Sequence, residues 1–225
     1  MQAGDLVIND SGAESALHYA SDITRTFPAG GEFTSQQKEI YTIVLQVQKK
    51  AIENIRAGIE YRAVHLIAAR EVVQALKALG LMAGDPDEAV AAGAHALFFP
   101  HGLGHMLGLD VHDMEDLGED YVGYTDSIQR NPQFGLCYLR LARKLEPGFI
   151  LTVEPGLYFI PDLIDQWKAE NKFTEFINYA KVEAYRHFGG VRIEDDVLVL
   201  TGGCRVLGRP IAKSIEEVET LAGEA

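Results

Sequence analysis

The sequence predicts an α+β fold in which short strands near the two ends of the chain enclose a helical middle. Residues 4–12 and 18–27 are rich in β-branched and aromatic side chains, with turn residues between them, and predict a hairpin. Residues 34–56 and 61–79 place apolar side chains at helical spacing. Such separate runs of strands and helices are typical of α+β proteins. Two more strands are predicted by later apolar runs, residues 148–159 and 189–200.

Local signals mark where the helices begin and end. A capping box made by Thr34 and Gln37 opens the first helix, and Gly58 follows its last turn. Asp85 precedes Pro86 at the start of a short third helix. Three further segments complete the prediction: a polar surface loop over residues 114–135, a helical insertion over residues 161–177, and a final helix from Ser214.

Composition excludes several classes of function. The chain has 225 residues, a net charge of −13 and an isoelectric point near 4.9, and it has no basic run that could follow a polyphosphate backbone. We therefore expect no nucleic-acid partner. Two cysteines without CxxC spacing indicate a reducing compartment, and no stretch is apolar enough for a signal peptide or a membrane span. We expect a single-domain cytoplasmic protein without a membrane partner.

Three carboxylates stand in apolar strand segments, where an unpaired charge is costly. Glu154 directly precedes a proline, which excludes a helix interior and places it at the end of a strand. Glu194 shares one strand face with Arg192 and Asp196. Asp22 lies in a strand that we expect to be largely buried, on the side opposite the bulky side chains of Tyr19, Ile23 and Phe27.

Together with Asp10, at the end of the first strand, and one imidazole, these carboxylates make a ligand set for two bridged divalent ions. The imidazole comes from a cluster of three histidines in twelve residues: His101, His105 and His112. Two other interpretations stay open. Asp10 can cap the turn that follows it, and the other three acids can be surface groups with salt-bridge partners.

Four segments resemble, in order, the signature blocks of the M24-type proline-specific metallopeptidases, the aminopeptidase P and prolidase family: residues 10–28, 101–113, 151–159 and 189–199. The resemblance implies the pita-bread fold, in which helices cover a curved antiparallel sheet. It also implies a dinuclear site that holds Mn²⁺, with Co²⁺, Zn²⁺ and Fe²⁺ as other candidates, and it implies a homodimer.

The same resemblance assigns roles to individual residues. The implied metal ligands are Asp10, Asp22, His105, Glu154 and Glu194, with Asp22 and Glu194 bridging the ions. Glu154 is also the implied general base. The implied substrate contacts are His101, His112, Tyr158 and Arg192. By the resemblance, the two histidines contact the substrate or stabilise the tetrahedral intermediate. Arg192 supports the bridging glutamate.

Residues 138–148 resemble the prolidase version of the family, in which Arg140 binds the free carboxylate of an Xaa-Pro dipeptide. Residues 159–190 also look like the bacterial prolidase form. The resemblance thus implies a hydrolase that cleaves the Xaa-Pro bond of dipeptides through a metal-bound hydroxide. Two alternatives stay open: Xaa-Pro aminopeptidase activity on longer peptides, and an ion pair between Arg140 and an acid of the loop at residues 113–120.

The resemblance assigns residues 1–225 to the catalytic domain and covers nearly all of them. Family members also carry a separate N-terminal domain and an upstream part of the catalytic domain, so we expect this chain to be partial. Eleven residues separate Asp10 from Asp22, one more than in the family pattern, so we expect a longer hairpin loop. A non-catalytic pita-bread module that binds a peptide is a further alternative.

Overall fold

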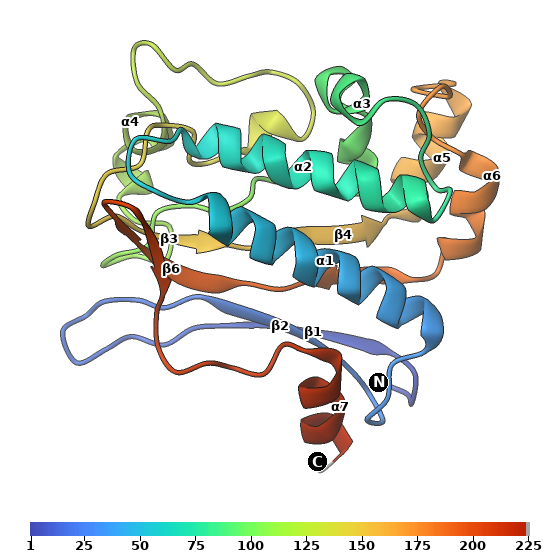
Figure 1. Cartoon of the computed structure of the whole chain (residues 1–225), viewed down its shortest axis with the longest axis horizontal. Helices are drawn as coiled ribbons and strands as arrows, with labels where there is room; N and C mark the ends of the chain where they lie inside the picture. Colours follow the sequence, from blue (N-terminus) through green and yellow to red (C-terminus); the bar gives the residue numbers. More distant parts are fainter. Residues whose placement is uncertain (224–225) are drawn as a thin grey trace.

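The computed structural model describes residues 1–223 and has two layers, which confirms the α+β prediction. Two long helices, α1 (Ser35–Asn54) and α2 (Tyr61–Ala78), lie side by side over antiparallel strands (Figure 1). One large apolar core fills the space between the layers. A second, small cluster lies under the loop that follows the histidines and contains Tyr124, Ile128, Leu139 and Ala142.

The predicted hairpin is confirmed, and the two sides of its second strand differ in burial. Strand β1 (Leu6–Ser11) pairs antiparallel with β2 (Ile23–Pro28). Thr24 and Thr26 are completely buried, whereas Ile23 and Phe27 are only partly buried and Tyr19 is exposed. The threonine side is the more buried one because residues near Glu194 and Arg192 pack on it.

Each of the two later strands is interrupted, and the interruptions carry the acids of interest. Glu154 lies between β3 and β4, and Glu194 lies between β5 and β6. Because β3 pairs with β6 while β4 pairs with β5, both interruptions fall at the same level of the sheet. The strand bounds are β3 (Ile150–Val153), β4 (Gly156–Phe159), β5 (Gly189–Arg192), β6 (Asp195–Leu200) and β7 (Gly203–Val206).

The signals for helix starts are also confirmed, whereas the predicted end of the first helix was wrong: α1 ends at Asn54 with Ile55 as an extended C-cap, so Gly58 does not cap it. Thr34 and Gln37 form the predicted capping box, and Asp85 accepts backbone hydrogen bonds at the start of α3. The segment expected to be a plain loop after the histidines contains the short helix α4. The remaining helices are α3 (Pro86–Ala92), α4 (Glu119–Gly123), α5 (Pro161–Ala169), α6 (Tyr179–Val182) and α7 (Ile215–Gly223).

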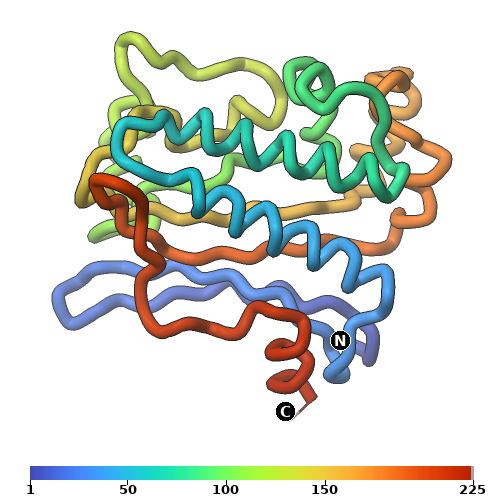
Figure 2. The backbone as a smooth tube through the Cα atoms, in the orientation of Figure 1, coloured from blue at the N-terminus to red at the C-terminus, as the bar shows by residue number. Residues whose placement is uncertain are grey.

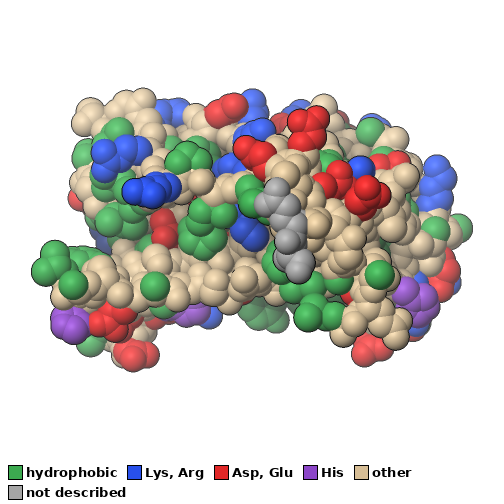
Figure 3. All heavy atoms as spheres, turned by 90° about the horizontal axis from the view of Figure 1, so that it is seen from below, with side chains coloured by type: hydrophobic (Ala, Val, Ile, Leu, Met, Phe, Trp, Pro, Cys, Tyr) green, Lys and Arg blue, Asp and Glu red, His purple; other side chains and the backbone are tan. Residues whose placement is uncertain are grey.

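The backbone trace shows how distant parts of the chain meet. The N-terminal hairpin runs beside the other strands at the lower edge of the view, where the C-terminal helix α7 contacts it, and α2 and α3 lie toward the upper edge (Figure 2). On the face seen in Figure 3, acidic and basic side chains are scattered without a continuous basic stripe. Within residues 1–223, no helix combines the length and the apolar character needed to cross a bilayer.

Candidate metal centre

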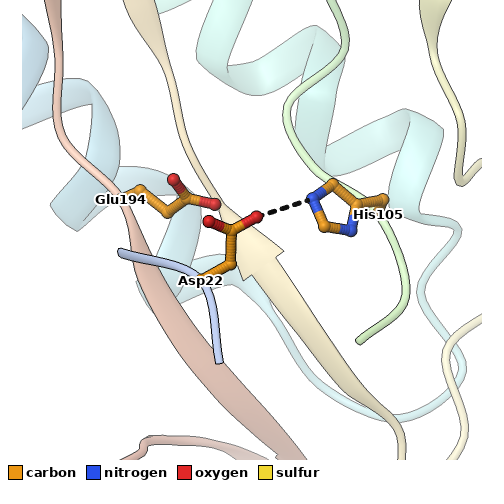
Figure 4. A group of neighbouring side chains, drawn as sticks. All are labelled: Asp22, His105 and Glu194. Carbon is orange, nitrogen blue, oxygen red and sulfur yellow. Dashed lines mark ion pairs between the residues drawn. The ribbon is translucent and has the colours of Figure 1, made fainter. Parts of the chain in front are cut away.

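Three side chains from distant parts of the sequence converge at the interrupted strands. Asp22 precedes β2, His105 lies in the loop before β3, and Glu194 lies between β5 and β6. Their ligand atoms all lie within 4.8 Å of one another, and the side chains point toward one another (Figure 4). His105 and Glu194 are almost completely buried. The structure therefore brings together three of the five residues proposed as ligands.

His105 is oriented by its backbone neighbours. Its Nδ1 lies 2.9 Å from the carbonyl oxygen of Met106, which can only accept, so Nδ1 carries the proton and donates it. Nε2 faces the acids, at 3.5 Å from Oδ2 of Asp22 and 3.4 Å from Oε1 of Glu154, and carries a lone pair when the ring is neutral. This is the tautomer that a histidine needs to bind a metal through Nε2.

Glu194 is buried, Glu154 is partly buried, and both carry raised pKa values. Burial raises the pKa of Glu194 to about 8 and the pKa of Glu154 to about 7, with a further contribution from the other acids nearby. Oε1 of Glu194 is buried and has no hydrogen-bond partner within residues 1–223. A divalent cation would satisfy that oxygen and stabilise the ionised carboxylates, so the donor set fits such an ion.

Asp10 lies at the edge of this group. It is half exposed, lies within β1 opposite Thr24, and forms an ion pair with Arg192. It also helps to keep the pKa of Asp22 below its usual value, although His105 contributes more and burial acts in the opposite direction. Asp10 is thus close to the three converging residues, and its role as a ligand stays a prediction.

A cleft of about 700 Å³ opens above these acids, and the two other histidines of the cluster line it. His101 is partly buried, its Nδ1 donates to the carbonyl oxygen of Gly102 at 2.7 Å, and desolvation lowers its pKa to about 4. Its ring is therefore neutral. His112 is partly exposed, and its ring meets that of His105 edge to face at 4.4 Å.

Arg192 reaches the candidate bridging glutamate indirectly. Its Nε donates to the hydroxyl of Thr24 at 3.0 Å, and that hydroxyl donates to Glu194 at 2.6 Å. Another nitrogen of Arg192 lies 3.5 Å from the hydroxyl of Tyr158. Sequence reasoning missed Thr24 and its counterpart Thr152. Their positions two residues from Asp22 and Glu154 on a strand could have indicated them, because such residues share one face.

Arg140 lies at the rim of the cleft and forms ion pairs with two acids of the neighbouring loop. It contacts Glu115 and, at 3.3 Å, Glu119. The structure thus contains the ion pair that the sequence left as an open alternative. Arg140 also lines the cleft, so the pairing leaves its predicted role as a carboxylate ligand untested.

These features define a class: an α+β protein with a buried group of acids and one histidine, suited to a divalent cation, where interrupted antiparallel strands meet. The sequence profile of metallopeptidase family M24 matches residues 1–201, and the chain belongs to that family. The family assignment predicted from the four sequence segments is therefore confirmed.

Relatives support the same assignment. The Xaa-Pro dipeptidase of Homo sapiens is 40% identical over 219 residues, which cover 97% of this chain and 43% of that protein. The Xaa-Pro dipeptidase of Xanthomonas axonopodis pv. citri is 42% identical over 202 residues, which cover 90% of this chain and 44% of that protein. The chain thus spans less than half the length of these relatives.

Solved structures confirm the predicted pita-bread fold. Zinc-substituted aminopeptidase P from E. coli, in complex with product, superposes with a TM-score of 0.75 at 40% identity. The E. coli enzyme with the inhibitor Pro-Leu gives a TM-score of 0.74 at 39% identity. Each match covers 99% of this chain and 42% of the solved chain.

Proposed function

We propose that the chain carries the catalytic site of a metal-dependent Xaa-Pro dipeptidase. The observation that carries this proposal is the convergence of Asp22, His105 and Glu194 beside Glu154, in a chain about 40% identical to proteins named Xaa-Pro dipeptidase. The proposed substrate is a proline-containing dipeptide. A cytoplasmic homodimer belongs to the same proposal and rests on the sequence alone.

The proposed ligands are Asp10, Asp22, His105, Glu154 and Glu194, which would hold two divalent ions, with Mn²⁺ as the favoured metal. Oxygen-rich sites with a single imidazole suit this group of metals. When bound, the ions would polarise the scissile carbonyl group and lower the pKa of a nearby water molecule.

The residues of the chain divide the remaining work. Glu154, beside His105, carries the proton from the attacking water to the nitrogen of the leaving proline. His101 is neutral and its Nδ1–H is already used, so Nε2 accepts a hydrogen bond from a substrate N–H. His112 is the imidazole that donates to the oxygen of the tetrahedral intermediate. Arg140 binds the free carboxylate of the dipeptide.

The test is proline release from Xaa-Pro dipeptides in the presence of Mn²⁺. We expect activity in the wild-type chain, loss of at least about 100-fold in Glu194→Ala, and no change in Glu53→Ala, which removes an exposed carboxylate of α1. Activity unchanged in Glu194→Ala would contradict the proposed site.

Aminopeptidase activity on longer peptides is the second candidate, favoured by the solved aminopeptidase P structures. Cleavage of Xaa-Pro-Yaa peptides without cleavage of Xaa-Pro would support it. Less than one equivalent of bound metal after Mn²⁺ loading would instead favour a non-catalytic peptide-binding module.

A further inference from the structure

Two buried threonines hold the two glutamates of the site in the same way. Thr24 lies on β2 and Thr152 on β3, and both are completely buried. The hydroxyl of Thr24 donates to Oε2 of Glu194 at 2.6 Å. The hydroxyl of Thr152 donates to Oε1 of Glu154 at 3.1 Å. Each threonine thus contacts one carboxylate through a single proton.

In both cases a second donor fixes the direction of that proton. Nε of Arg192 donates to the hydroxyl oxygen of Thr24 at 3.0 Å. The backbone N–H of His105 donates to the hydroxyl oxygen of Thr152 at 3.1 Å. A guanidinium nitrogen and a backbone N–H can only donate, so each hydroxyl must turn its own proton toward its glutamate. The threonines therefore act as oriented donors.

Backbone contacts strengthen each pairing. The backbone N–H of Glu194 donates to the carbonyl oxygen of Thr24 at 3.1 Å. The backbone N–H of Thr152 donates to the carbonyl oxygen of His105 at 3.0 Å. A Cβ atom on Gly104 would lie 2.1 Å from the carbonyl oxygen of Thr152, so only glycine allows the histidine loop to approach this closely. The chain thus brings both threonines into contact with proposed ligands from other segments.

We propose that Thr24 and Thr152 are positioning residues, which fix the oxygen that Glu194 and Glu154 each present to a bound divalent cation. Oε2 of Glu194 is occupied by Thr24, whereas Oε1 is buried without a hydrogen-bond partner within residues 1–223. The hydroxyl of Thr24 thereby leaves Oε1 of Glu194 free for the cation, whereas Thr152 holds in place Oε1 of Glu154, the oxygen that lies 3.4 Å from Nε2 of His105. This inference rests on the metal-binding role given to the two glutamates in the proposed function.

The chain offers a matched control in Thr26. It is as buried as Thr24 and lies two residues further along the same face of β2. Its hydroxyl donates to the backbone carbonyl oxygen of Arg192 at 2.8 Å and accepts from the backbone N–H of the same residue at 3.1 Å. Thr26→Val therefore removes a buried hydroxyl without removing a contact to a carboxylate.

The experiment is a calorimetric titration of the metal-free chain with MnCl₂, with the electron paramagnetic resonance spectrum of bound Mn²⁺ as a second measurement. We expect Thr24→Val and Thr152→Val each to weaken Mn²⁺ binding about 10- to 100-fold, as for other residues that orient metal ligands, and to alter the spectrum. Thr24→Ser and Thr152→Ser, which retain the hydroxyl, should restore both. Thr26→Val should bind Mn²⁺ like the wild type.

Thermal unfolding of each metal-free variant checks that it is folded. If Thr24→Val does not fold, Thr24→Cys replaces it, because a thiol is a weak donor of similar shape. Wild-type binding retained in both valine variants, or an equal loss in Thr26→Val, would overturn the inference while leaving the proposed function intact. A wild-type chain that does not bind Mn²⁺ would overturn the proposed function and this inference together.

Discussion

The floor and the rim of the cleft are built in different ways. The floor consists of His105 and of buried or partly buried acids, whose two glutamates lie at interruptions of paired strands and accept hydrogen bonds from Thr24 and Thr152. The rim is a loop with short helices, in which Arg140 and Arg130 form ion pairs with acids at partly exposed positions. Rigid strands suit residues whose geometry decides chemistry, whereas a loop suits residues that recognise a substrate.

The largest effect is expected from a change in the floor. Glu154→Gln keeps the size of the side chain but removes its ability to carry a proton, so we expect kcat for proline release to fall by about 10² to 10⁴. The assay uses saturating Mn²⁺, so that weaker metal binding does not account for the loss. Glu146→Gln, at an exposed position in the segment before β3, is the control. A kcat within threefold of wild type would show that Glu154 is not the proton carrier.

A change in the rim should affect binding rather than chemistry. Arg140→Met removes the guanidinium group proposed to bind the substrate carboxylate, so we expect KM for Xaa-Pro to rise about 10- to 100-fold with little change in kcat. The matched comparison is an amidated dipeptide, which lacks the carboxylate and should be cleaved equally by both proteins. If both substrates lose the same factor, Arg140 supports the loop through its acidic partners instead.

The layer beneath the floor gives a pH-dependent prediction. His65 is completely buried, faces His95 and His101, and has a pKa lowered to about 3 by burial and by these two histidines. In the unfolded chain His65 becomes protonated near pH 6.5, whereas in the folded chain it stays neutral until the pH is much lower. The free energy of unfolding therefore falls as the pH drops below 6.5. At pH 5 this costs about 2 kcal/mol. The free energy of unfolding of wild type, relative to His65→Leu, should decrease by that amount between pH 7 and pH 5, and a constant difference would refute this.

The smallest effect should come from Arg130, which joins the two ends of the rim loop. It pairs with Glu119 and Asp120, donates to the backbone oxygens of Cys137 and Leu139, and lies over the ring of Tyr124. Because such exposed pairs contribute little, Arg130→Gln should lower the free energy of unfolding by about 1 kcal/mol, and less in high salt. Mn²⁺ affinity should not change, and a large loss of affinity would mean that floor and rim are coupled.

The floor was more predictable from sequence than the rim for a physical reason. Glu154 before Pro155 limits the local backbone, and apolar strand segments make unpaired carboxylates costly, so short stretches already indicate a buried polar site. The burial of Thr24 and Thr26 could not be predicted in this way. Which side of a half-polar strand is buried depends on the segments that pack against it, and those come from residues near position 194.

The rim depends on pairings that no periodicity encodes. Arg140 contacts Glu115 and Glu119 across 25 and 21 residues of chain that contain only short helices. Several acids in that loop could have paired with Arg140. The three-dimensional path of the loop determines which of them do. The sequence therefore predicted that an acid of this loop could pair with Arg140 but did not predict which acid.

Because the strand interruptions lie side by side, the cation site depends on the correct register of the strands. Thr152 lies opposite Asp196 in the β3–β6 ladder, and Asp196 accepts the backbone N–H of Asp22. A slip of β3 by one residue would turn Thr152 to the other face of the sheet and separate it from both His105 and Glu154. Only the correctly paired chain would then assemble the cation site, so divalent metal would favour one register over its neighbours during folding.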